Sequence, residues 1–138
     1  MTTLNKFNSF VEAVAEKTHN LGSDTLKLVL TGTPPSSTDT VLTDITEIAN
    51  GNGYTTGGTQ AVQNYSAQVA GTYRLGLNDV TFTATGTMAS FRYAVLYNAS
   101  ATNDELVAFT DYGSSITLTT GDTFSVNFDQ TNGVLSIT

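Results

Sequence analysis

The chain of 138 residues has no cysteine, no tryptophan, one histidine and two prolines. Without cysteine it has neither a disulfide framework nor a thiolate metal site, and one histidine leaves zinc without its usual ligands. Charged residues make up only 12% of the sequence, while threonine, serine, asparagine and glycine are abundant. This composition favours hydroxyl-rich β surfaces over long solvated helices, and the length fits a single domain over residues 1–138.

Positive charge is also scarce. Five basic residues stand against twelve acidic ones, the net charge is −7, and lysines and arginines nowhere cluster. Nucleic-acid binding needs a basic surface that displaces counterions from phosphates, so the sequence argues against a nucleic-acid partner. The same sign argues against anionic membrane surfaces, and no apolar run approaches the roughly 20 residues of a membrane span. No apolar run follows Met1 to Lys6, so we expect no secretory signal.

One stretch near the N-terminus has a helical period. Its apolar residues recur at steps of three and four: Leu4, Phe7, Val11 and Val14. The spacing predicts an α-helix over residues 4–18, capped by Thr2 or Thr3 and ending near His19 and Gly22. A lone helix of this length is marginal in water. Its apolar stripe must therefore dock, either on the sheet of its own chain or on a neighbouring subunit.

The strongest strand signal lies at residues 91–97. Large apolar side chains occupy every second position: Phe91, Tyr93, Val95 and Tyr97. Side chains of a strand alternate between faces, so these four are predicted to line one face without a break. The intervening residues are half apolar, which indicates cover on the second face too. We predict that residues 90–98 form the central strand of the sheet core.

Further alternating segments, separated by turn residues, predict the remaining strands. They lie at residues 24–31, 60–69, 73–77, 80–84, 106–111, 116–119, 123–128 and 134–138. The segments 116–119 and 123–128 are expected to form a hairpin, and Tyr65 and Val69 are expected to point inward. Residues 41–48 fit either a short strand or a helical turn. About eight strands after one helix predict an all-β fold, an antiparallel β-sandwich of jelly-roll-like form.

The motifs that carry chemistry in other proteins are weak here. The glycine-rich loop at residues 50–58 is one residue off the dinucleotide-binding pattern and no helix signal follows it, so a tight structural loop is the better interpretation. His19 at a predicted helix end indicates a capping or solvated side chain rather than a catalytic base. Asp104 and Glu105 form the only adjacent acidic pair, without EF-hand spacing. We expect no catalytic residue, no metal site and no cofactor.

Several stretches resemble small virion structural proteins of tailed bacteriophages. The similarity is carried by residues 10–24, residues 42–58 including Gly51-Asn52-Gly53-Tyr54, residues 91–98 (Phe-Arg-Tyr-Ala-Val-Leu-Tyr-Asn), and residues 111–118 beginning Asp-Tyr-Gly-Ser-Ser. The resemblance implies a non-enzymatic protein. By analogy of size and predicted fold, the implied role is that of a capsid decoration, or cement, protein. Such a protein is made in the bacterial cytoplasm and binds the capsid exterior.

Under this hypothesis the partners are the major capsid protein and copies of the protein itself, as a dimer or trimer. The candidate contact residues are on the helix stripe, the loop at 32–38 and the glycine loop: Leu4, Phe7, Val11, Val14, Pro34, Pro35 and Tyr54. Two alternatives stay open. One is a neck, tail or head-fibre component, and the other, of a different class, is a carbohydrate-binding β-sandwich.

Overall fold

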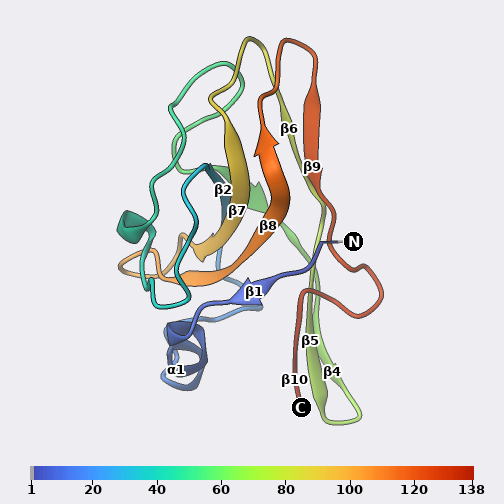
Figure 1. The fold of residues 1–138 in the computed structure, drawn as a ribbon. Coiled ribbons are helices and arrows are strands. Elements are labelled where there is room, and N and C mark those ends of the chain that lie inside the picture. Colours follow the sequence, from blue (N-terminus) through green and yellow to red (C-terminus); the bar gives the residue numbers. More distant parts are fainter. Residues whose placement is uncertain (1) are drawn as a thin grey trace.

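The computed structural model describes residues 2–138 and is mostly antiparallel β, with 42% of residues in strands (Figure 1). A short helix, α1 (Ser9–Ala15), lies near the N-terminus, and residues Leu42–Asp44 form a 3-10 turn. The strands are β1 (Asn5–Lys6), β2 (Leu26–Thr31), β3 (Thr59–Ala61), β4 (Gln63–Val69), β5 (Thr72–Leu77), β6 (Val80–Thr83), β7 (Phe91–Asn98), β8 (Leu106–Ile116), β9 (Thr123–Val126) and β10 (Leu135–Ile137).

The strands form three sheets, none of them closed. The largest has the order β1-β8-β7-β2-β3, a second has the order β10-β5-β4, and β6 pairs with β9 alone. Figure 1 shows β6 and β9 at one end of the molecule and β4, β5 and β10 at the other. Strand β7 lies in the middle of the five-stranded sheet, which confirms the prediction of a central strand at residues 90–98.

Both faces of the five-stranded sheet are covered, and β2 shows how alternation achieves this. Leu26, Leu28 and Leu30 are fully buried in the main core, while Val29 is buried in a smaller cluster with Phe7. Alternate side chains of a strand project to opposite faces, so one strand supplies both cores. The main core also receives residues from outside this sheet, on β5, β6 and β9: Leu75, Leu77, Val80, Phe82 and Val126.

One expectation about the central strand is wrong. Phe91 does not share a face with Val95 and Tyr97: it lies in the main core with Ala94 and Leu96, while Val95 and Tyr97 lie in the smaller cluster. The register against β8 shifts between Phe91 and Tyr93. The pairing moves from Ile116 to Asp111 on β8 over two residues of β7, so the ladder is irregular at this end of β7. The strict alternation of faces is lost there, and Phe91 and Ala94 both reach the main core.

The predicted helix over residues 4–18 is also too long, because its first residues form a strand. Asn5 and Lys6 pair with Phe109 and Ala108 of β8, and α1 begins only at Ser9. The residue before the helix is Asn8, not Thr2 or Thr3, and its side chain makes no capping hydrogen bond. Strand pairing supplies hydrogen bonds that an isolated N-terminal turn lacks, so the long-range contact overrides the local period.

The helix ends earlier than the sequence indicates. Lys17 has a φ of 68°, in the left-handed region, and the helix ends at Ala15 rather than near Gly22. A left-handed residue just past the last turn is a common way to stop a helix.

Two predicted strands are rearranged. The segment at 60–69 is divided into β3 and β4, and Tyr65 and Val69 are exposed instead of pointing inward. The predicted hairpin of 116–119 with 123–128 does not form: β9 pairs with β6, and β8 runs on to Ile116. The strand predicted at residues 134–138 forms as β10, which pairs with β5.

Candidate interaction surface

An apolar groove of about 550 Å³ separates α1 from the C-terminal strand β10. Leu96 of β7 and Val107 and Ala108 of β8 line it between these two elements. Its sides are formed mainly by aliphatic residues: Leu4, Phe10, Val11, Val14, Val134, Leu135 and Ile137. Figure 1 shows α1 and β10 on either side of the lower end of the molecule. We refer to this feature as the α1–β10 groove.

The rim of the groove is exposed apolar surface. Val11 is 56% exposed and Ile137 is 43% exposed, although Phe10 below them is buried. Lys6 is the one charged residue among those that line it. Exposed aliphatic side chains gathered around a hollow are typical of a binding site, because scattered ones are common but clustered ones are not.

The sequence-predicted contact residues are only partly brought together. Leu4, Val11 and Val14 line the α1–β10 groove. Phe7 is fully buried on the opposite face of the sheet, packed against Phe109 with ring centroids 5.1 Å apart. Residue 7 belongs to the extended segment after β1 rather than to the helix, which is why it leaves the stripe. The helical period alone gave no signal of this.

The loop at 32–38 lies elsewhere. Pro34 is exposed and Pro35 is half-buried, and neither lines the groove. The backbone N–H of Asn8 donates to the carbonyl oxygen of Ser37 at 2.9 Å, so the loop is tied to the segment before α1. The two prolines therefore stay separate candidates from the groove residues.

Tyr54 is buried, so its ring presents no surface to a partner. Its hydroxyl donates to the Glu47 carboxylate, and Glu47 Oε1 also accepts the backbone N–H of Gly57 at 2.8 Å. Burial raises the pKa of the Tyr54 hydroxyl, and the neighbouring Glu47 carboxylate raises that pKa further. The hydroxyl therefore remains a proton donor at neutral pH, and the glycine loop is held inward through it.

The glycines in this loop allow backbone segments to approach closely. Gly53 and Gly58 have φ angles of +102° and +78°, and a β-carbon would collide with the carbonyl oxygens of Thr83 and Leu28 respectively. Strand β3 follows the loop, whereas the dinucleotide-binding pattern is followed by a helix. The Tyr97 hydroxyl also donates to the Gly57 carbonyl oxygen at 2.6 Å.

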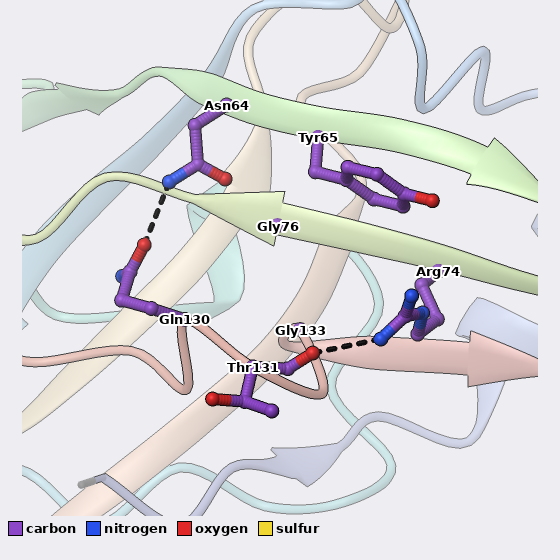
Figure 2. A pocket seen from close by; sticks show the side chains of 7 residues that line it. All are labelled: Asn64, Tyr65, Arg74, Gly76, Gln130, Thr131 and Gly133. Carbon is purple, nitrogen blue, oxygen red and sulfur yellow. Dashed lines mark hydrogen bonds between the residues drawn. The ribbon is translucent and has the colours of Figure 1, made fainter.

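A polar hollow of about 320 Å³ lies beside β4 and β5 (Figure 2). Asn64 Nδ2 donates to Gln130 Oε1 at 2.7 Å, and Arg74 Nη1 donates to the Thr131 carbonyl oxygen at 2.7 Å. The Arg74 guanidinium also lies over the Tyr65 ring, 5.3 Å from its centroid. These hydrogen bonds fasten the turn at residues 129–133 to the sheet.

His19 is buried, which corrects the expectation of a capping or solvated side chain. Its Nδ1 lies 2.9 Å from Asn98 Nδ2, and the same amide nitrogen donates to Asp24 Oδ2 at 2.6 Å. Nδ1 accepts the amide hydrogen, which leaves Nε2 as the protonated nitrogen, buried and without a hydrogen-bond partner. Burial lowers the pKa of His19, and the charges of Glu105 and Asp24 oppose that shift.

No family model, no curated protein and no solved structure matches the chain. Within residues 2–138 no three His, Asp or Glu side chains gather in a metal-binding arrangement, and no helix there has the length and hydrophobicity to cross a membrane.

Proposed function

We propose that this protein is a non-enzymatic structural protein of a tailed-phage virion, and within the virion a decoration protein on the outer surface of the capsid. The observation that carries the proposal is the α1–β10 groove, an apolar surface that the chain itself leaves uncovered. Covering such a surface with another protein removes apolar area from water, which is the main driving force of association.

The distribution of core residues supports a jelly-roll-like sandwich as the form of the scaffold. The main core takes side chains from the five-stranded sheet and from β5, β6 and β9, as a core packed between two β layers would. Such a block has a well-packed interior and presents its loops and edges outward. It suits a protein whose work is to hold other subunits.

Charge and sequence agree with a protein partner. The net charge of −7 disfavours DNA, whereas an apolar groove with one lysine suits a protein surface. The resemblance of residues 10–24, 42–58, 91–98 and 111–118 to phage virion proteins points to the major capsid protein as that partner. Many copies bound to a repeating shell gain strength through their number, even when each contact is small.

The test is binding to capsids that lack the protein. We expect purified protein to cosediment with undecorated capsids and to raise their melting temperature. Burial of a valine contributes roughly 1.5–3 kcal/mol, and 1.4 kcal/mol is tenfold in affinity. Val11→Asp, on the exposed rim, should therefore weaken binding by at least about tenfold. Val62→Asp is the matched control, because Val62 is 47% exposed and lies outside the groove.

Three results would contradict the proposal. The decoration role is contradicted if capsids never take up the protein, or if they melt at the same temperature with and without it. Equal losses for the two aspartate variants remove the groove as the contact. Electron microscopy of the virion adds the copy number: hundreds of copies support a shell protein, whereas a few copies on the tail axis support a neck or tail component.

A further inference from the structure

Strand β4 is the longest strand at the edge of a sheet in the part of the chain that the structure describes. It spans Gln63–Val69 and pairs on one side only, with β5. The other edge strands are between two and four residues long: β1, β3, β6, β9 and β10. A short edge strand offers little to another chain, whereas a long one is a template for a further strand.

Nothing on β4 blocks such an addition. Its sequence, Gln-Asn-Tyr-Ser-Ala-Gln-Val, contains no charged residue and no proline, the usual protections of an exposed edge. All of its residues after Gln63 are exposed. The side-chain hydrogen bonds from β4 to segments outside the β4–β5 hairpin come from its first two residues. Gln63 Nε2 donates to the carbonyl oxygens of Leu21 and Asp24 at 3.2 and 2.6 Å, and Asn64 Nδ2 donates to Gln130 Oε1 at 2.7 Å.

The hairpin turn determines which backbone groups of β4 face outward. Ala70 and Gly71 form a two-residue turn with φ angles of 53° and 83°, so Val69 and Thr72 make the first hydrogen-bonded pair of the hairpin. Pairing alternates along the ladder, and the backbone groups of Ser66 and Gln68 therefore point away from β5. Neither residue makes a backbone hydrogen bond to another part of residues 2–138.

We propose that β4 pairs with β4 of a second copy of this chain, antiparallel and across a two-fold axis at Ala67. In this register Ser66 and Gln68 of one copy exchange backbone hydrogen bonds with Gln68 and Ser66 of the other. An antiparallel pair of identical strands is isologous, so both copies satisfy the same groups at once. The two three-stranded sheets become one continuous sheet of six strands.

The side chains fit this register. Residues 65, 67 and 69 share one face of β4, so Tyr65 of each copy lies opposite Val69 of the other, and the two Ala67 side chains meet on the axis. Tyr65 is 39% exposed and Val69 is 56% exposed in the single chain. Aromatic and β-branched side chains directly opposite each other are among the favourable cross-strand pairs. The pairing therefore covers the two large apolar side chains that are exposed on this strand.

Charge does not oppose a second copy at this edge. Each chain carries a net charge of −7, so two copies repel one another over most of their surface. The sheet β10-β5-β4 contains a single charged residue, Arg74, and none on β4 itself. At this edge two copies can therefore approach without placing like charges opposite each other. Salt should strengthen the contact, because it screens the repulsion between the acidic surfaces elsewhere on the two chains.

The inference goes beyond the shell-binding proposal, because it concerns the contact between two copies and is measured without capsids. Sedimentation of the purified chain over a range of concentrations should give a dimer of twice 14.5 kDa. Ala67→Lys places two positive charges opposite each other on the axis and should weaken the dimer by up to about fivefold. Ala49→Lys, at an exposed loop residue, adds the same charge away from the edge and should leave the dimer intact.

A cysteine tests the register, since the chain has none of its own. Ala67 is a non-hydrogen-bonded pair with itself, where Cα atoms lie about 4.5 Å apart, within the range that a disulfide spans. Ala67→Cys should therefore form a covalent dimer under mild oxidation, while Ser66→Cys and Ala49→Cys should not.

The proposal is overturned by a chain that sediments as a monomer at every concentration, or by a trimer. It is also overturned if Ala67→Lys dimerises as well as Ala49→Lys, or if Ser66→Cys cross-links in preference to Ala67→Cys. Loss of capsid binding in Val11→Asp with dimerisation retained would separate the two surfaces.

Discussion

The Tyr54 hydroxyl offers the sharpest test of how the glycine loop works. Tyr54→Phe keeps the buried ring and removes only the oxygen that donates to the Glu47 carboxylate. The same oxygen also accepts the Leu30 N–H at a long 3.4 Å. If the residue acts by holding the loop against the core, the variant should lose stability and keep its partner binding.

The magnitude follows from the partners of the lost oxygen. A hydrogen bond to a charged group contributes about 1.5–3 kcal/mol, and the bond to Leu30 adds little at its length. Glu47 retains the Gly57 N–H, so its carboxylate is not left without a donor. We expect unfolding free energy to fall by about 1.5–3 kcal/mol, which for a chain of this length lowers the melting temperature by roughly 5–10 °C.

Urea denaturation followed by tyrosine fluorescence or circular dichroism measures this change. Tyr112→Phe is the control, because Tyr112 is 59% exposed and its hydroxyl makes no hydrogen bond to the rest of residues 2–138. We expect that control to change stability by less than about 0.5 kcal/mol. A Tyr54→Phe protein with unchanged stability would refute the anchoring role, and lost capsid binding at unchanged stability would restore Tyr54 as a contact residue.

Other predictions concern backbone geometry and pH. Gly58→Ala should lower the free energy of unfolding by more than about 4 kcal/mol or prevent folding, because its β-carbon would meet the Leu28 carbonyl oxygen at a positive φ. Gly71→Ala, at φ +83° with open space around it, should lower it by only about 1 kcal/mol. Thermal denaturation measures both changes. The pKa of His19 is lowered in the folded chain, so the unfolded chain binds the proton first: stability should be full above about pH 6.5 and decrease as pH falls below that value. His19→Gln should flatten this part of the stability–pH curve, and an unchanged curve would contradict the assignment.

The local pattern of apolar residues was enough to predict the strands that bury side chains on both faces of the sheet. Leu26, Leu28 and Leu30 alternate with polar or β-branched residues, and β2 forms where that alternation predicts it. Strand β7 was recognisable as central because apolar residues fill both of its sides, which an edge strand does not need. Of the candidate site, the sequence identified Leu4, Val11 and Val14, although it placed them on one helix.

The sequence by itself determined that the chain is β-rich, acidic and poor in cysteine, histidine and basic side chains, because composition and alternation are local properties. Only the tertiary structure decided which segments pair. Pairing of Asn5–Lys6 with β8 shortened the helix, irregular pairing with β8 accompanies the position of Phe91 in the main core, and exposure of β4 left Tyr65 and Val69 uncovered. These outcomes depend on hydrogen bonds and contacts between residues far apart in the chain, and no local window contains both partners.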